Sequence, residues 1–379
     1  MTAADRTVGR VEAESQVVAD PDETVERPMT HRANNFDFLR LVGALLVVLG
    51  HAYPLLGAPA ATPGLIGYGV QSIGVVIFFS ISGYLITASW NRTRDPLSYA
   101  AARCLRIFPG LAVVVLVCAC VLGPLLTVLP VGDYATHPQT TDYLNNILMK
   151  PVYFLPGVFT DLPYANVVNG SLWTLPAEFL CYIVVPLALV VPRLARPAVI
   201  AVLLALSLWY AATPPMESAV VYGTRISDAA VMWVFFAAGV LLRLGHERVS
   251  GLFRADVAVG LFATYLLVIA IEPTWVGHVS WVALPYLVLA VGLASTPYIR
   301  QAARFGDLSY GIYLWAFPVQ QTVIHVAGVQ NMAVNLIVVT ALTALLALIS
   351  WHVVEKPALR LKNRVPRLAQ VKVSWRGGR

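Results

Sequence analysis

An arginine and a histidine in the first long apolar stretch have residue types and a spacing that could act on one substrate. His51 follows Arg40 by eleven residues. In an α-helix eleven residues make three turns plus about 20°, so both side chains lie on one face, roughly 16 Å apart along the axis. Arginine binds phosphate oxygens, and a neutral histidine accepts a proton from a hydroxyl group. A structural origin is equally consistent: Arg40 obeys the positive-inside rule and His51 hydrogen-bonds within a helix bundle.

A second pair of cations stands at the start of a later apolar run. Arg103 and Arg106 are three residues apart and therefore share a helix face. Paired guanidinium groups at a membrane surface suit a pyrophosphate or several phosphates. Anchoring to anionic lipid headgroups is the alternative interpretation.

Two carboxylates occupy apolar surroundings. Glu178 is the only carboxylate in the run Ser171–Val191, about two turns from its outer end. A lone buried glutamate needs a partner or a proton, so it could orient His51, bind an acceptor hydroxyl, or play a structural part. Glu355 ends the last apolar run, where it could pair with Arg103 or Arg106 or form a simple helix-end ion pair.

Aromatic side chains form the weakest signal. Tyr313 and Trp315 belong to the run 308–315, whose rings could line a sugar or acyl site, although packing between helices explains them equally well. Trp173, which precedes Glu178, would help to shape the acceptor side. The cysteines lack metal-ligand spacing, so we expect no metal site.

The composition indicates that these residues lie in a membrane. Hydrophobic residues make up 58% of the 379 residues and charged residues 12%. A soluble domain would carry roughly 25% charged residues. The net charge of +6 is spread over short segments between apolar runs, which argues against binding to nucleic acid.

Apolar runs of about 20 residues predict an all-α, polytopic integral membrane bundle of about ten transmembrane helices. The fifth run is the shortest. The ten runs are Phe36–Leu56, Gly67–Trp90, Leu105–Leu129, Ser171–Val191, Pro197–Ala212, Ser227–Leu244, Phe253–Ile271, Gly277–Ser295, Phe305–His325 and Met332–Val354.

The distribution of basic residues supports this count and places both termini in the cytoplasm. With ten spans, all of the 26 Lys and Arg except Lys150 and Arg225 lie on the cytoplasmic side. The positive-inside rule predicts this asymmetry, and adding or removing one span would destroy it. We expect a disordered cytoplasmic tail at 1–34, a membrane domain at 35–357 and a basic cytoplasmic tail at 358–379.

Six sequence runs occur in the order found in the acyltransferase-3 family, which the chain resembles over roughly residues 34–360. No single run is specific to this family, but six runs in this order, on a frame of ten predicted spans, are specific to it. They are the Arg-x10-His pair at 40–51, FFSISGYLIT at 78–87, RCLRIFP at 103–109, SLWTLPAEF at 171–179, LSYGIYLW at 308–315 and VVEKP at 353–357.

The resemblance implies transfer of an acyl group, often acetyl from acetyl-CoA, to a hydroxyl of a saccharide, a glycolipid or another cell-envelope acceptor. One departure is Ala316, which stands where many members have a histidine after the LYLW run, so any role of that histidine is absent. The functional positions that the resemblance carries over are Arg40, His51, Arg103, Arg106, Trp173, Glu178 and Glu355.

The leading hypothesis is therefore an O-acyltransferase of the bacterial plasma membrane, with acyl-CoA as co-substrate and no resident cofactor. It has catalytic residues His51, Arg40 and Glu178, acyl-CoA-binding residues Arg40, Arg103 and Arg106, and acceptor or supporting residues Trp173, Glu355, Tyr313 and Trp315. A transporter or flippase of a lipid-linked glycan is the alternative, because intramembrane charges and kinked helices suit transport too.

Overall fold

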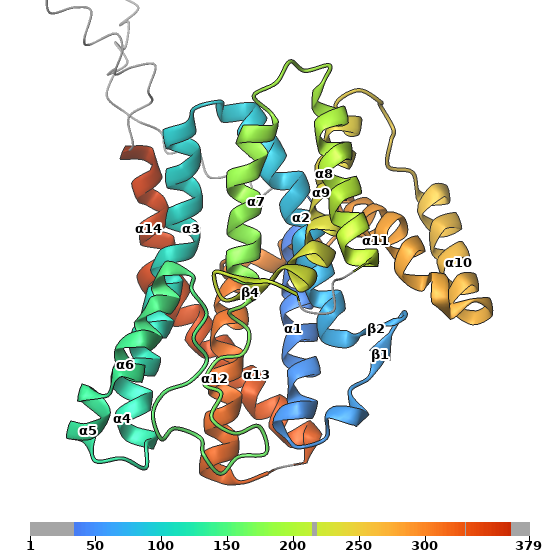
Figure 1. Cartoon of the computed structure of the whole chain (residues 1–379). Coiled ribbons are helices and arrows are strands. Elements are labelled where there is room, and N and C mark those ends of the chain that lie inside the picture. The colour runs from blue at the N-terminus through green and yellow to red at the C-terminus, as the bar shows by residue number, and fades with distance from the viewer. Residues whose placement is uncertain (1–33, 214–217, 330, 365–379) are drawn as a thin grey trace, which may run out of the picture. The chain divides into compact units, whose positions relative to one another are not determined.

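The computed structural model describes residues 34–213, 218–329 and 331–364, and these residues are mostly helical (Figure 1). Ten helices are fifteen or more residues long. They are α1 Phe36–Leu55, α2 Val70–Thr93, α3 Pro96–Val117, α7 Thr174–Ala188, α8 Arg196–Ala212, α9 Ile226–His246, α10 Ala255–Ile271, α11 Val276–Leu293, α12 Ser309–Ala327 and α13 Met332–Ser350.

Short elements connect these helices. The short α-helices are α4 Gly123–Leu126, α5 Val131–Thr136, α6 Pro138–Tyr143 and α14 Lys356–Arg360. Two π-helices, η2 Cys118–Leu122 and η6 Trp351–Glu355, continue α3 and α13. The 3-10 helices are η1 Pro59–Ala61, η3 Leu144–Leu148, η4 Pro273–Trp275, η5 Ile299–Phe305 and η7 Leu361–Arg364. Strand β1 Gly64–Leu65 pairs antiparallel with β2 Tyr68–Gly69, and β3 Val220–Val221 with β4 Thr224–Arg225.

The predicted all-α membrane bundle is confirmed, and every predicted run overlaps one of the ten long helices. Within the described residues, six segments are long and apolar enough to cross a bilayer, and α7, α8 and α10 are shorter apolar helices. The count of ten crossings therefore stays a prediction. The predicted tails lie mostly outside the described residues, although α14 and η7 extend the helical chain to Arg364.

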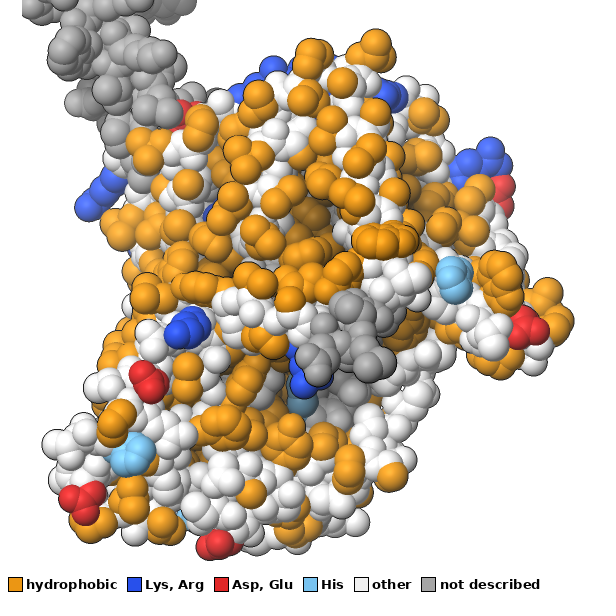
Figure 2. Space-filling view, in the orientation of Figure 1, with side chains coloured by type: hydrophobic (Ala, Val, Ile, Leu, Met, Phe, Trp, Pro, Cys, Tyr) orange, Lys and Arg blue, Asp and Glu red, His pale blue; other side chains and the backbone are white. Residues whose placement is uncertain are grey.

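The outer surface of the bundle is apolar. Large hydrophobic side chains are exposed on several helices, among them Leu187 on α7, Leu206 on α8 and Leu345 on α13. Figure 2 shows such side chains spread over one face, with few charged groups among them. Hydrocarbon rather than water suits this surface, so the chain is a multi-pass membrane protein.

Glycines let α2 lie in close contact with both α1 and α9. A Cβ atom on Gly83 of α2 would stand 2.1 Å from the backbone oxygen of Phe236, and one on Gly239 of α9 would stand 2.4 Å from that of Ser80. Gly43 and Gly74 bring α1 and α2 together in the same way. Small residues at such crossings favour packing of membrane helices.

The segment between α6 and α7 packs along α12. The Asn169 amide donates to the backbone oxygen of Leu314 at 3.0 Å, and the Gln321 amide donates to those of Tyr164 and Val167. These bonds fix the position of the chain that leads into α7, and with it the residues at the start of that helix.

The predicted topology can be tested with reporters fused after Asn166, Arg248, Glu272 and Arg300. Because three and seven crossings precede the first and third positions, alkaline phosphatase should be active after Asn166 and Glu272. Six and eight crossings precede the other two, so green fluorescent protein should fluoresce after Arg248 and Arg300. If α8 does not cross, the results after Arg248, Glu272 and Arg300 will all be reversed, and only the result after Asn166 will stay the same.

Candidate active site

Charged side chains from three distant parts of the chain meet near the start of α12. Nη2 of Arg106 on α3 lies 2.6 Å from Oδ2 of Asp307, and its Nη1 lies 3.6 Å from Oε2 of Glu355. Nη1 of Arg40 on α1 lies 3.8 Å from the same Asp307 oxygen and 3.7 Å from Oδ1 of Asp37. We call Arg40, Arg103 and Arg106 the arginine cluster.

The sequence predicted that Glu355 could pair with Arg103 or with Arg106. The structure contains the pair with Arg106. Its carboxylate is almost fully buried, and Oε1 accepts a hydrogen bond from the Ser350 hydroxyl at 2.9 Å. The guanidinium of Arg106 also lies over the rings of Tyr310 and Trp351, at 5.4 and 5.9 Å. Arg106 is thereby held in place on several sides.

Arg103 has a different environment. Its guanidinium lies 6.0 Å from the ring of Tyr99, and its buried Nε has no hydrogen-bond partner. It is within electrostatic range of Arg40 and Arg106. Among the described residues no carboxylate forms an ion pair with Arg103, so its charge is the least compensated of the cluster and the most open to an added anion.

His51 lies on the same continuous helix as Arg40, eleven residues further along α1. Its Nδ1 is 2.9 Å from the backbone oxygen of Val47. Because a carbonyl oxygen only accepts, Nδ1 carries the hydrogen and Nε2 of the neutral ring is the basic nitrogen. The ring edge meets Phe317 with the two centroids 5.5 Å apart.

One face of α12 connects the arginine cluster with His51. Tyr310, Tyr313 and Phe317 follow one another at helical spacing along this face. Tyr310 contacts Arg106, and Phe317 contacts His51. Tyr313, between them, donates to the backbone oxygen of Ser171 and shares a hydrogen bond with the Thr174 hydroxyl. Helix α12 thus extends from the arginine cluster, which contains Arg40, to His51.

Glu178 belongs to a polar group between α2 and α7. Its Oε1 accepts hydrogen bonds from the Ser82 hydroxyl, at 2.7 Å, and from Tyr182. The ring of His51 is oriented by the Val47 carbonyl, so the possible pairing of Glu178 with His51 is not formed. The backbone oxygen of Tyr182 accepts from Tyr99, whose ring faces Arg103, and this links Glu178 to the arginine cluster.

The two predicted tryptophans lie apart from these contacts. The backbone oxygen of Trp173 precedes α7 and accepts a hydrogen bond from Thr224 at 3.2 Å. Trp315 lies on the face of α12 opposite to Tyr313 and Phe317, where it lines a groove with α3 and α13. This hydrogen bond joins the start of α7 to β4. Trp315 faces away from His51.

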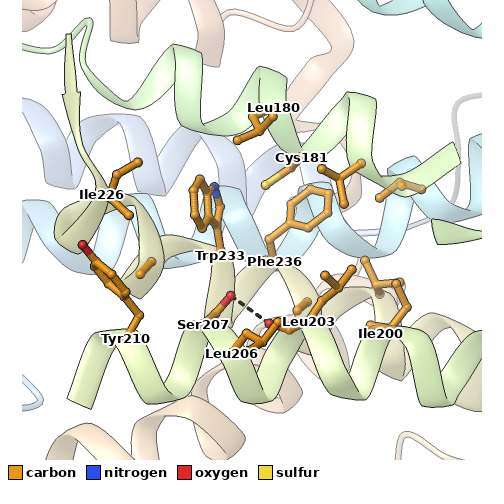
Figure 3. Close-up of a pocket in the computed structure, with 15 residues that line it drawn as sticks. Leu180, Cys181, Ile200, Leu203, Leu206, Ser207, Tyr210, Ile226, Trp233 and Phe236 are labelled. Carbon is orange, nitrogen blue, oxygen red and sulfur yellow. Dashed lines mark hydrogen bonds between the residues drawn. The ribbon is translucent and has the colours of Figure 1, made fainter. Parts of the chain in front are cut away.

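An apolar pocket of about 300 Å³ lies between α7, α8 and α9 (Figure 3). Leu180 and Cys181, which follow Glu178 closely in the chain, line it, but Glu178 does not. Ser207, which lines it, donates to the backbone oxygen of Leu203, and Nε1 of Trp233 donates to that of Ala177 at 3.2 Å. No charged side chain lines this pocket. Ser207 and Trp233 are therefore already paired, and the rest of the lining is apolar apart from Tyr210 and Cys181.

Sequence reasoning missed two residues of the site. Asp307 pairs with two arginines, and a signal for it exists, since it is the one carboxylate between the basic segment 300–304 and α12. Phe317 gave no signal, because its contact with His51 depends on how α12 packs against α1. In the described parts of the chain no group of three or more His, Cys, Asp or Glu could hold a metal ion.

The bundle thus carries a histidine towards one end of α1 and a cluster of arginines at the other. A family model described as "Acyltransferase domain" matches residues 34–353. The chain therefore belongs to the acyltransferase-3 family, and it is an O-acyltransferase rather than the transporter that the sequence left open.

Two relatives are similar over nearly their whole length. The chain is 30% identical over 337 residues to an O-acetyl transferase of Shigella phage Sf6, covering 86% of this chain and 96% of the relative. It is also 30% identical over 370 residues to nodulation protein 10 of Rhizobium leguminosarum bv. viciae, covering 89% and 96%. No solved structure matches the chain significantly.

We predict that Asp307→Asn destabilises the protein by about 2 kcal/mol. The loss is smaller than the roughly 3–5 kcal/mol for breaking a fully buried pair, because the carboxylate is 19% exposed. Thermal unfolding in detergent measures it. The matched control is Asp256→Asn, which breaks the exposed pair with Arg254 and should leave the midpoint unchanged. Equal midpoints for both variants would contradict the role given to Asp307.

Proposed function

We propose that the protein transfers an acyl group, in the simplest case acetyl, from acyl-CoA to a hydroxyl of a saccharide or glycolipid. The observation that carries the proposal is the geometry of α1. Its Arg40 end belongs to a cluster of three arginines, and its His51 end presents a ring whose Nε2 is the basic nitrogen. An anionic donor and a hydroxyl acceptor would meet along this helix.

The arginine cluster suits the phosphates of the donor. Under the predicted orientation it lies at the cytoplasmic end of α1 and α3, where acyl-CoA is available. Arg103 would provide the first contact, since it forms no ion pair with a carboxylate of the described residues, and Arg40 and Arg106 would add charge from either side. The pantetheine arm would then run along the face of α12 that carries Tyr313.

The reaction itself needs one base. Nε2 of His51 would take the proton of the acceptor hydroxyl as its oxygen attacks the thioester carbonyl carbon. When the tetrahedral intermediate collapses, the carbon–sulfur bond breaks and the imidazolium returns the proton to the leaving thiolate. The products are the acyl ester and free coenzyme A, and His51 is neutral again.

Aromatic rings beside His51 suit a sugar acceptor. Phe317 stands edge-on to the imidazole, and Tyr164 of the segment between α6 and α7 lies 6.2 Å from Phe317. Rings offer flat apolar faces of the kind that ligand sites use for orientation. Glu178, held by Ser82 and Tyr182, is further along the same bundle and would shape the site rather than take the proton.

The decisive experiment compares cells that lack the gene with cells complemented by wild type or by His51→Ala. We expect lipid and glycan mass spectrometry to show loss of one acyl increment, restored by wild type alone. In purified protein, His51→Ala should lower kcat by roughly 100- to 10,000-fold, because a general base is removed. His278→Ala, an exposed histidine on α11, is the control and should restore fully. Restoration by both variants would remove His51 from the mechanism.

Donor binding is tested separately by calorimetry with acetyl-CoA. Arg103→Ala should weaken binding about tenfold or more, since a charged hydrogen bond contributes roughly 1.5–3 kcal/mol. Arg254→Ala removes an exposed arginine outside the cluster and should bind like wild type. If both variants bind acetyl-CoA like wild type, the phosphates are not held by the cluster.

A further inference from the structure

A groove of about 560 Å³ lies on the outer side of α12, between α3 and α13. Its walls are almost entirely aliphatic, with Val113 and Val117 from α3, Val319 from α12, and Leu345 and Ile349 from α13. No charged side chain lines it. The volume is within the roughly 300–1,000 Å³ typical of ligand sites. In a membrane such walls suit a hydrocarbon chain.

One residue that lines the groove has a buried polar atom without a partner. Trp315 lines the groove and is only 7% exposed, yet its Nε1 makes no hydrogen bond. A buried indole N–H ordinarily has an acceptor. Trp233 in the pocket of Figure 3 shows the contrast, since its Nε1 is satisfied by the backbone oxygen of Ala177. The indole N–H of Trp315 is therefore a buried donor for which the described residues supply no acceptor.

The depth of Trp315 indicates the chemical group that carries this oxygen. Trp315 follows the first residue of α12, Ser309, by six positions, or about 9 Å along the axis. The polar zone of each leaflet is roughly 5–8 Å thick. With the first residue of α12 taken to lie at the membrane surface, the indole would lie near the boundary with the hydrocarbon core. Ester carbonyl groups of glycerolipids lie at this boundary, where tryptophan is enriched in membrane proteins.

Basic residues stand at the same end of the groove. Val353 and Val354 of η6 line it, and α14 follows immediately with Lys356 and Arg360, both exposed. Two cations at the membrane surface attract a negatively charged headgroup. The groove thus combines aliphatic walls, a tryptophan whose N–H is unpaired, and two basic residues that follow its lining at one end.

Both π-helices of the described chain contribute to this groove. Leu122 belongs to η2, and Val353 and Val354 belong to η6. A π-turn widens the helix and occurs frequently at functional sites. These irregular turns stand where α3 and α13 border the groove.

We propose that the groove binds an anionic glycerophospholipid from the leaflet at the α12 start, which is the cytoplasmic leaflet in the predicted orientation. An acyl chain lies between α3 and the α12–α13 pair, an ester carbonyl accepts from Trp315 Nε1, and the phosphate faces Lys356 and Arg360. This site is separate from the proposed acyl transfer, because α12 stands between the groove and His51.

The test uses the full-length protein in phosphatidylcholine nanodiscs that contain a small fraction of phosphatidylglycerol with a photoactivatable acyl chain. Peptide mass spectrometry locates the crosslinks. We expect them to concentrate on groove residues of α12 and α13. Trp315→Phe should reduce this labelling about fivefold, the equivalent of a hydrogen bond of roughly 1 kcal/mol. Trp233→Phe, a matched change in the pocket of Figure 3, should not.

Further variants separate the parts of the proposal. Leu345→Trp, at a position 54% exposed, should fill the groove and abolish labelling, whereas Leu206→Trp, at a position 56% exposed in the other pocket, should not. Replacing both Lys356 and Arg360 with Gln should lower labelling to the level of an equivalent phosphatidylcholine probe.

Three results would overturn the proposal: crosslinks spread evenly over the outer helices, labelling unchanged in a folded Trp315→Phe protein, or equal labelling of wild type by the phosphatidylcholine probe. Folding of each variant is checked by its elution profile and thermal midpoint. His51→Ala should keep the labelling while losing acyl transfer, so failure of the lipid site and failure of the proposed function are distinguishable.

Discussion

Arg106 joins three segments of the chain that are far apart in sequence. Its two terminal nitrogens lie near Asp307, which precedes α12, and near Glu355, which ends η6. Charges within a membrane bundle are costly when unpaired, so this arrangement strongly restricts how α3, α12 and α13 can pack. The same aspartate also pairs with Arg40 and so brings in the start of α1. Ion pairs of Arg40 and Arg106 with Asp307 and Glu355 therefore hold together the end of the site that carries the arginine cluster.

From this anchor α12 separates two environments. One side carries Tyr310, Tyr313 and Phe317, which lead from the arginines to His51. The other side carries Trp315 and Val319, which face the groove shared with α3 and α13. A helix of nineteen residues thus lines the proposed reaction path on one side and the groove on the other. Ser350, which lines the groove, hydrogen-bonds Glu355 of the charged site.

Hydrogen bonds from neighbouring residues fix the side chains that could act chemically. The Val47 carbonyl sets the proton position on His51, Ser82 and Tyr182 fix Glu178, and the segment leading into α7 is bonded to α12 through Asn169. Arg103 is the exception, since its Nε is buried without a partner. A cation in this state is suited to a ligand that brings its own negative charge.

The sequence by itself determined the all-α membrane class, the positions of the ten long helices and the shared helix of Arg40 and His51, because apolar length and the 3.6-residue period are local properties. It also marked Glu355 as a partner for an arginine. Only the tertiary structure decided that Arg106 rather than Arg103 takes that partner, that Asp307 bridges two arginines, and that Phe317 rather than Glu178 meets His51. Those contacts join helices distant in the chain, and their identity depends on how the helices rotate and cross, which no local pattern specifies.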